Sequence, residues 1–304
     1  MIHGHQFIFR DEPLLREEYE AFSLLYPPQT HDSTIEVIKA TDVGVIKKFA
    51  YQSDWRLLSA QNVRYWSHLP FEKVGKGESW GLEVKGVLFL LWEASTRKII
   101  YIKDKGFTPY RLRFWIYHTF FSIVLDLEEK YTMMHVGAVE IARKPVFFSA
   151  PSFGGKSTLT DYFLKQGHTL FSDDSLPVHR ENDRYFAIPS FPYHRPYRKP
   201  EELGYFVENF AKTKKPIHAV YLLERVEADE DIYITVLQGI EKYEALHFSN
   251  FIDFSFTKKR RFLFFSQMAK YLPVYKITLP WDLKRLNEVY CMIVEHSQSF
   301  VDKS

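Results

Sequence analysis

Residues 146–174 read VFFSAPSFGGKSTLTDYFLKQGHTLFSDD, and this order of apolar and polar segments predicts the core of the fold. PVFFSA (145–150) and HTLFS (168–172) are short apolar runs, typical of strands that are buried on both faces. KSTLTDYFLKQ between them predicts a helix with Leu159, Tyr162 and Phe163 on one face and Gly167 at its C-terminal cap. A strand, a loop, a helix and a second strand form a βαβ arrangement, in which ligands gather at the carboxyl ends of the strands.

The loop before this helix, APSFGGKS, differs from the strict phosphate-loop pattern only at Ala150, where that pattern has glycine. Its backbone amides can converge on an anion, and the helix N-terminus adds unpaired N–H groups and a positive dipole. Gly154 and Gly155 permit close approach of the backbone, and Ala150 is compatible with the loop if its φ is negative. Lys156 is expected to reach the β- and γ-phosphates, and the Ser157 hydroxyl to ligate Mg²⁺.

The position of the loop between a buried strand and an amphipathic helix favours a nucleotide site over a helix N-terminus that only happens to read GGKST. The expected nucleotide is ATP, with Mg²⁺ as its metal ion. The residues assigned to nucleotide binding are Ala150, Pro151, Ser152, Phe153, Gly154, Gly155, Lys156, Ser157 and Thr158.

Two adjacent carboxylates, Asp173 and Asp174, close the second apolar strand. Where a strand ends, the chain turns, so both side chains can approach one site. One suits Mg²⁺, and the other can accept a proton from an attacking hydroxyl. Taken alone, SDDS also fits a polar turn. Its place after the loop and strand favours the site. His135, on the preceding predicted strand, is by itself more typical of a packed residue than of a chemical one.

Composition excludes several classes of function. The chain has 304 residues, 46% hydrophobic and 26% charged, enough for one large domain or two with a sizeable core. The formal net charge is +2, so there is no general basic field for nucleic acid. Cys291 is the only cysteine, which leaves no disulfide framework or cysteine-based zinc site and favours a reducing cytoplasm. The N-terminal stretch MIHGHQFIFRDEPLL has no apolar core of signal-peptide length. The most apolar stretches, residues 86–92 and 115–125, are far shorter than the ~20 residues that a membrane helix needs.

The first half of the chain predicts a smaller α+β domain, residues 1–127. GHQFIFR reads as a strand, PLLREEYEAFSLLY as a helix, and SWGLEVKGVLFLLWEASTRKIIYIKD as a hairpin that turns near Ser95 and Thr96. YRLRFWIYHTFFSIVLDLEEKY, after Pro109, reads as one helix that ends near Lys130.

The second half, residues 128–304, predicts an α+β or α/β core around a central mixed sheet. TMMHVGAVEIA (132–142) reads as one alternating strand, followed by a tight turn at 143 and 144. Further strands are expected at IHAVYLLER (217–225), DIYITVL (231–237) and LPVYKITL, with helices at GIEKYEALHF, TKKRRFLFFSQMAKYL and PWDLKRLNEVYCMIVEHSQ.

MHVGAVEI, FFSAPSFGGKSTL and KQGHTLFSDD together resemble the kinase domain of bacterial HPr kinase/phosphorylase. They resemble even more the related serine kinases with LH-x-x-x-V-x-I, a GKSTL loop and G-x-x-L-x-S-D-D, some of them found with peptide natural-product pathways. The spacing agrees too: the histidine lies fifteen residues before Ala150, and the aspartates lie seventeen and eighteen after Lys156. The likeness covers residues 130–200 well and the remaining C-terminal part only by element order.

This resemblance implies a role for each matching residue. Lys156 and the loop amides would bind phosphates, and Ser157 with Asp173 would hold the metal ion. Asp174 would be the base that takes the proton from the acceptor hydroxyl, and His135 would lie beside the reacting group. The N-terminal domain, which is β-rich in the relatives, would recognise the acceptor.

Beyond the aspartates the chain departs from HPr kinase. In place of a signature with glutamate and arginine it has IPSFPYHRPYRKPEE (188–202), which resembles the P-x-x-P-x-x-R segment of the serine kinases. The resemblance therefore implies neither the reverse phosphorylase reaction nor HPr as acceptor. Arg195, Arg198 and Lys199 could stabilise the charge of a transferring phosphate, with Arg195 preferred because the related segment has arginine there. A proline-stiffened surface loop with incidental charge is an equal alternative.

The resulting hypothesis is an ATP-dependent, Mg²⁺-requiring kinase that phosphorylates serine or a similar hydroxyl on a peptide, protein or small molecule. Two alternatives remain at this stage: a nucleotide-binding regulatory module without phosphotransfer, and an enzyme like PEP carboxykinase, which shares the core architecture. The sequence does not name the acceptor. Whether the chain forms homo-oligomers, as HPr kinases do, is also left open.

Overall fold

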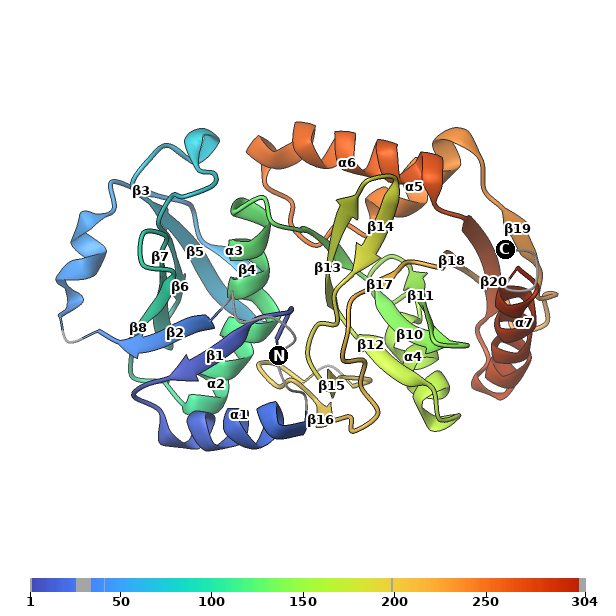
Figure 1. The fold of residues 1–304 in the computed structure, drawn as a ribbon, viewed down its shortest axis with the longest axis horizontal. Coiled ribbons are helices and arrows are strands. Elements are labelled where there is room, and N and C mark those ends of the chain that lie inside the picture. The colour runs from blue at the N-terminus through green and yellow to red at the C-terminus, as the bar shows by residue number, and fades with distance from the viewer. Residues whose placement is uncertain (1, 26–33, 41, 198, 301–304) are drawn as a thin grey trace. The chain divides into compact units, whose positions relative to one another are not determined.

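The computed structural model describes residues 2–25, 34–40, 42–197 and 199–300 (Figure 1). The chain divides into two compact units, the first comprising Met1–Tyr131 and Arg198–Leu203 and the second Thr132–Tyr197 and Gly204–Ser304. Compared with the predicted domains, 1–127 and 128–304, the first unit also takes in residues 128–131 and a short segment from the second half.

The first unit is built on a mixed eight-stranded sheet with the order β1-β2-β8-β7-β6-β5-β3, in which β4 pairs with β5. β1, β2 and β8 run parallel, and β8 to β5 form an antiparallel meander. Its strands are β1 (Gln6–Phe9), β2 (Thr34–Lys39), β3 (Tyr51–Gln52), β4 (Arg56–Leu58), β5 (Gln61–Ser67), β6 (Trp80–Val84), β7 (Leu88–Glu93) and β8 (Lys98–Lys103). Its helical elements are α1 (Pro13–Leu25), η1 (Val43–Lys48), η2 (Phe71–Lys73), α2 (Pro109–Phe114), η3 (Trp115–Phe120) and α3 (Phe121–Leu127).

The long helix predicted after Pro109 is helical from Pro109 to Leu127, three residues short of Lys130, and its middle part is a π-helix, η3. Every residue of η3 and α3 is buried. The predicted strand is present as β1. The stretch predicted as one hairpin is a three-stranded meander, β6–β7–β8, because a second tight turn at 85–87 precedes the predicted turn near Ser95 and Thr96. The predicted helix PLLREEYEAFSLLY is α1, and its last predicted residue, Tyr26, lies outside the described residues.

The short segment from the second half joins the first unit through Glu201. The Glu201 carboxylate accepts hydrogen bonds from the Arg111 guanidinium at 2.8 Å, from the Trp115 indole at 2.7 Å and from the Gln61 amide at 2.9 Å. Its side chain is only 7% exposed, so these donors compensate for the loss of water around the charge.

The second unit contains a six-stranded sheet of order β12-β10-β11-β18-β20-β19, a four-stranded sheet of order β17-β14-β13-β9 and the pair β15-β16. The six-stranded sheet is mixed, since β11, β18 and β20 are parallel and the other pairs antiparallel. The strands of the second unit are β9 (Thr132–His135), β10 (Gly137–Ile141), β11 (Lys144–Ser149), β12 (Thr169–Ser172), β13 (Ser175–Glu181), β14 (Arg184–Ala187), β15 (Tyr193–His194), β16 (Tyr205–Phe206), β17 (Lys215–Pro216), β18 (Ala219–Val226), β19 (Ile234–Val236) and β20 (Val274–Pro280). Its helical elements are α4 (Lys156–Lys165), α5 (Gly239–Phe248), η4 (Ser255–Thr257), α6 (Lys258–Tyr271), η5 (Leu283–Arg285) and α7 (Leu286–Gln298).

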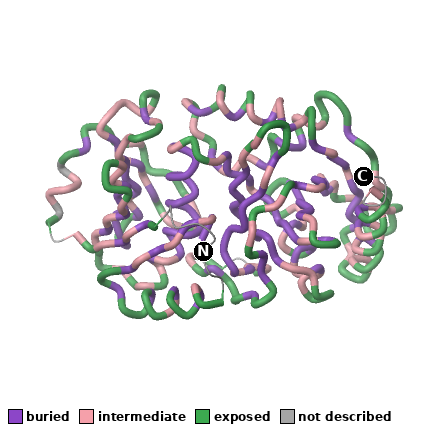
Figure 2. The backbone as a smooth tube through the Cα atoms, in the orientation of Figure 1, coloured by how far each residue is buried: buried purple, intermediate pink, exposed green. Residues whose placement is uncertain are grey.

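Both faces of the six-stranded sheet are covered, as the apolar composition of β11 predicts. Val146 and Phe148 pack with Leu159 of α4 and Val289 of α7, whereas Phe147 packs on the opposite face with residues of α5 and α6. This alternation follows the two-residue repeat of a strand. The strands at the centre of the unit are accordingly buried (Figure 2). The structure thus confirms a mixed α+β fold.

The single strand predicted over residues 132–142 is wrong. It is two strands, β9 and β10, which belong to different sheets and separate at Val136. The alternating pattern does not show the break because Val136 is itself fully buried. The tight turn lies at Ala142 and Arg143, one residue earlier than predicted, and both residues have the positive φ of a two-residue hairpin loop.

No helix within the described residues is long and apolar enough to cross a membrane.

The pH dependence of stability follows from two histidines in the first unit. Burial lowers the pKa of His3 to about 4, and burial followed by the nearby Lys130 ammonium lowers the pKa of His5 to about 3. His5 donates through Nδ1 to the His3 carbonyl at 2.8 Å, and its Nε2 lies 3.1 Å from the Lys130 ammonium, an arrangement that suits the neutral ring. Unfolding frees both rings to protonate at their ordinary pKa.

The free energy of unfolding is therefore expected to fall as pH drops below about 6.5, with each histidine costing about 2 kcal/mol at about pH 5. Chemical denaturation at about pH 6.5 and at about pH 5 measures this loss in the free energy of unfolding. A His5→Gln variant should lose less stability on acidification than the wild type, whereas His247→Gln, at an exposed position, should match the wild type. Equal acid sensitivity of His5→Gln and wild type would show that this ring is not responsible.

Candidate functional site

The glycine loop, defined here as residues 150–155, connects the carboxyl end of β11 to the start of α4. Lys156 is the first residue of the helix and is only 4% exposed. Its ammonium group donates to the carbonyl of Ala150 at 2.6 Å and lies 3.3 Å from that of Pro151. The lysine thus turns back over the loop, with its charge held at the loop's own backbone rather than in open solvent.

Each unusual residue of the loop has a steric reason. Gly155 has a φ of 91°, and a Cβ there would lie 2.7 Å from the Leu279 side chain. A Cβ on Gly154 would lie 2.7 Å from that of Ala150. Ala150 is not among the residues with positive φ, so the methyl group is compatible with its backbone, as the sequence required. Phe153 has a φ of 63° and is 79% exposed, leaving its ring on the surface of the loop.

The two aspartates lie where the chain crosses from one sheet to another. β12 ends at Ser172 in the six-stranded sheet, and β13 begins at Ser175 in the four-stranded sheet. β9 and β10 make the same crossing in the opposite order at Val136, whose amide donates to the Asp174 carbonyl at 3.1 Å. His135 is paired with Ser175 in the register of β9 and β13. The two crossings therefore run side by side.

This arrangement brings together two of the predicted residues. His135 Nδ1 lies 3.2 Å from Asp174 Oδ1, with side-chain exposures of 23% and 12%. The imidazole also stacks on Phe251, with ring centroids 6.3 Å apart. An imidazole at this distance can orient the neighbouring carboxylate, which stays partly accessible.

Ser249 links this pair to the glycine loop. Its carbonyl accepts from the His135 amide at 2.6 Å, and its hydroxyl lies 2.7 Å from that of Ser149, the residue that precedes the loop. Both serines are fully buried. Because each hydrogen bond is short and shielded from water, the start of the loop and the end of β9 are held in fixed relation. The sequence gives no local sign of Ser249, which caps α5 about a hundred residues away from Ser149.

Asp173 has different neighbours. Its Oδ2 accepts the backbone N–H of Arg195 at 2.7 Å, and its Oδ1 lies 2.9 Å from His194 Nδ1. His194 is fully buried, and its other nitrogen lies 3.5 Å from Asp161 Oδ1 on α4. The 2.9 Å contact lacks hydrogen-bond geometry despite its length, so we treat it as an electrostatic contact between the two groups.

Tyr205 completes this group by donating its hydroxyl to Asp161 Oδ1 at 2.9 Å. Burial and then this hydrogen bond raise the pKa of Tyr205. Asp161, His194 and Tyr205 were not singled out from the sequence. One local feature could have indicated His194, namely its place directly before Arg195 in FPYHRPY. The pairing of β15 with β16 includes both His194 and Tyr205.

The basic residues of the segment IPSFPYHRPYRKPEE (188–202) belong to different units. Arg195 is brought to Asp173 by its backbone amide, while the role predicted for its guanidinium stays a prediction. Lys199 belongs to the segment of the first unit and lies 3.8 Å from Glu202 on the surface. Arg198 lies outside the described residues.

Two further residues come from the carboxyl ends of the strands parallel to β11. β18 ends with Arg225 and Val226, and Trp281 directly follows β20. The Arg225 guanidinium lies 3.7 Å from the centre of the Trp281 ring. In open α/β sheets this edge is where ligands bind, so both side chains are positioned to contact one. Sequence reasoning missed both residues, although Arg225 ends the strand predicted at 217–225 and Trp281 lies just beyond the strand predicted at LPVYKITL.

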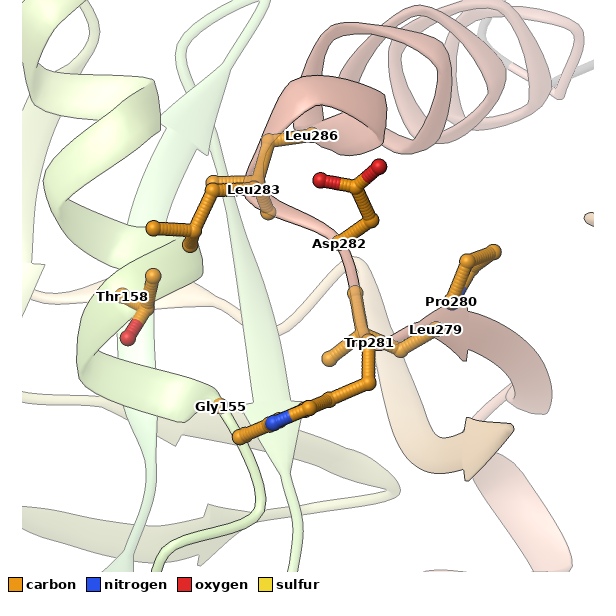
Figure 3. Close-up of a pocket in the computed structure, with 8 residues that line it drawn as sticks. All are labelled: Gly155, Thr158, Leu279, Pro280, Trp281, Asp282, Leu283 and Leu286. Atoms are coloured by element: carbon orange, nitrogen blue, oxygen red, sulfur yellow. The ribbon is translucent and has the colours of Figure 1, made fainter. Parts of the chain in front are cut away.

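Two cavities flank the glycine loop. One, of about 430 Å³, is lined by Pro151, Ser152, Phe153, Gly154, Leu222, Leu223, Glu224, Arg225 and Phe248. The other, of about 210 Å³, is lined by Gly155, Thr158, Leu279, Pro280, Trp281, Asp282, Leu283 and Leu286 (Figure 3). Residues of the loop therefore line two cavities of different size.

A magnesium ion fits the donors present only as part of a complex with phosphate. Among the described residues, no group of three or more histidine, cysteine, aspartate or glutamate side chains is arranged to hold a metal ion. Ser157 is half-buried at the start of α4, and Asp173 is 6% exposed with Oδ1 lacking a hydrogen bond of good geometry. Mg²⁺ commonly takes one or two protein oxygens and completes its shell with phosphate oxygens and water.

Comparison with known proteins gives little beyond this geometry. No protein-family model matches the chain, and no curated protein matches it. Among solved structures, the chain is similar to the Hpr(Ser) kinase/phosphatase from Coxiella burnetii, at 14% sequence identity and a TM-score of 0.35 over 55% of this chain and 97% of that chain. A likeness this weak does not establish a shared function.

The helix that follows the glycine loop, α4, packs closely against β10, and this contact can be tested by substitution. A Cβ on Gly137 would lie 2.3 Å from the Thr160 hydroxyl oxygen. Gly137→Ala should therefore lower the free energy of unfolding by about 1–3 kcal/mol. Gly137→Ala combined with Thr160→Ala should recover most of that loss, measured by denaturant titration. Gly75→Ala is the control because a Cβ there meets no atom within 4 Å. A single variant as stable as the control would show that the helix is not held this close.

Proposed function

We propose that this protein is an ATP-dependent, Mg²⁺-requiring kinase that transfers the γ-phosphoryl group to a hydroxyl, such as that of serine, on a peptide, protein or small-molecule acceptor. The observation that carries the proposal is the His135–Asp174 pair, 3.2 Å apart and tied through Ser249 to the residue before the glycine loop. A site that only binds a nucleotide has no need of an oriented base beside its phosphate loop.

In the proposed reaction, the loop amides, the α4 N-terminus and Lys156 bind the phosphates of ATP. Ser157 and Asp173 would hold Mg²⁺, which supplies charge neutralisation at the phosphate oxygens. Asp174 accepts the proton of the acceptor hydroxyl as its oxygen forms a bond to the γ-phosphorus. The bond from that phosphorus to the bridging oxygen breaks, and ADP leaves with the bonding electrons.

The neighbouring residues suit this division of roles. His135 positions the Asp174 carboxylate, while Asp173 is held in a separate direction by the Arg195 amide and His194. The two adjacent carboxylates therefore point to different partners, which allows one to serve the metal ion and the other the proton. Recognition of the acceptor is proposed for the first unit.

Removal of the base should stop transfer without removing nucleotide. Asp174→Asn keeps the size of the side chain but not its proton affinity, so phosphoryl transfer should fall by about 100-fold or more. Incubation with γ-labelled ATP and lysate of the source cells measures transfer, and calorimetry measures ADP binding, which should stay within about threefold. Asp183→Asn is the control because that carboxylate is 72% exposed. If Asp174→Asn transfers label at a near-normal rate, another group is the base.

Removal of the loop lysine should have a different signature. Lys156→Met keeps an unbranched side chain at a buried position but loses the charge, so ADP affinity should fall by about 10- to 100-fold. Transfer should fall with it. Lys259→Met, at an exposed lysine, is the control. Undiminished ADP binding by Lys156→Met would rule out the loop as the phosphate site. A regulatory module would bind ADP through Lys156 yet yield no labelled acceptor even as wild type.

A further inference from the structure

The cavity beside Gly155 has no role in the phosphate chemistry described above. It lies between the first turn of α4 and the segment that follows β20, and its floor is Leu279, which is 3% exposed (Figure 3). Trp281 and Leu283 form its rim and are 46% and 73% exposed. We propose that this cavity binds the base of a purine nucleotide, with Trp281 as the residue that stacks on it. This inference rests on the proposed nucleotide site.

The size and lining of the cavity favour a nucleobase. Its volume of about 210 Å³ is below the roughly 300–1,000 Å³ typical of pockets for whole small molecules, so it suits one ring system of a larger ligand. Leucine side chains and an indole dominate the lining. Such a surface binds a flat heteroaromatic ring by stacking and burial rather than by hydrogen-bond readout.

The cavity is continuous with the phosphate site through shared residues. Gly155 belongs to the glycine loop and also lines the cavity, and a Cβ on it would lie 3.8 Å from the Trp281 ring. Thr158, the third residue of α4, lines the cavity from the other side. The first N–H groups of a helix lack partners within the helix. A phosphate chain bound at these groups therefore has its nucleoside end within reach of the cavity.

Trp281 is held in position for this task. Its backbone amide donates to the Val226 carbonyl at 3.1 Å. The Arg225 guanidinium lies over the Trp281 ring, 3.7 Å from its centre. Trp281 nevertheless lines the cavity. A ring fixed on one side by a cation loses little freedom when a base stacks on it. Asp282, which also lines the cavity, accepts the Lys284 amide through Oδ1 at 2.9 Å and so caps the short helix η5.

The test compares a ligand that has a base with one that has none. Calorimetric titrations with Mg²⁺–ADP and with Mg²⁺–pyrophosphate are made on the wild type, Trp281→Ala and Trp281→Phe. Trp281→Ala should weaken ADP binding by about 5- to 100-fold and leave pyrophosphate binding unchanged. Trp281→Phe should keep most of the ADP affinity because it retains an aromatic face.

Trp55→Ala is the matched control. Trp55 is also a partly exposed tryptophan, 38% exposed, with an arginine over its ring at 4.4 Å, but it lies in the first unit. The Trp55→Ala variant should bind Mg²⁺–ADP and Mg²⁺–pyrophosphate with the same affinity as the wild type. Circular dichroism and thermal melting establish that each variant is folded.

The outcomes separate the two proposals. Equal ADP affinity of Trp281→Ala and wild type, with pyrophosphate bound by both, overturns the base pocket but leaves the phosphate site standing. Equal weakening of ADP and pyrophosphate by Trp281→Ala also overturns the base pocket, because the residue would then act on the loop. Failure of the wild type to bind either ligand overturns the proposed function itself.

Discussion

The hydrogen bond from the Val136 amide to the Asp174 carbonyl joins two segments that leave one sheet and enter another at the same place. Strand pairing continues on both sides of it, through β9 with β13 and through β10 with β12. At such a crossing the side chains leave the two-faced alternation of a single sheet. His135, Asp173 and Asp174 are therefore held by ordered backbone and yet can turn toward a ligand.

The same crossing explains why the adjacent aspartates differ. Asp174 faces His135 across the paired segments, whereas Asp173 faces the backbone of Arg195 and the buried ring of His194. A buried carboxylate needs a donor such as the Arg195 amide, since an isolated charge away from water is costly. The contacts of Asp173 extend through His194 to Asp161 and hence to α4, the helix that begins with Lys156. Loop, helix and aspartates thus form one connected polar group within the second unit.

The sequence predicts those parts of this site that depend on neighbouring residues. The glycine loop, α4 and the strand that ends just before Asp173 follow from local composition. Ala150 is not among the residues with positive φ, as the loop requires. Ser249, His194, Arg225 and Trp281 escape prediction because they reach the site from distant segments, and only the sheet topology brings them there. The break at Val136 is hidden for another reason: a buried valine satisfies the alternating pattern on either side of it.

In the proposed reaction, Lys156 and Asp174 act on opposite sides of one phosphoryl group. A crystal structure of the protein with Mg²⁺ and a non-hydrolysable ATP analogue tests this arrangement. We expect the β- and γ-phosphates to lie in the glycine loop, beside the Lys156 ammonium, with the Asp174 carboxylate facing the γ-phosphorus from the side opposite the bridging oxygen. A triphosphate bound away from the loop, or a γ-phosphate that Asp174 cannot reach even through an acceptor hydroxyl, would contradict it.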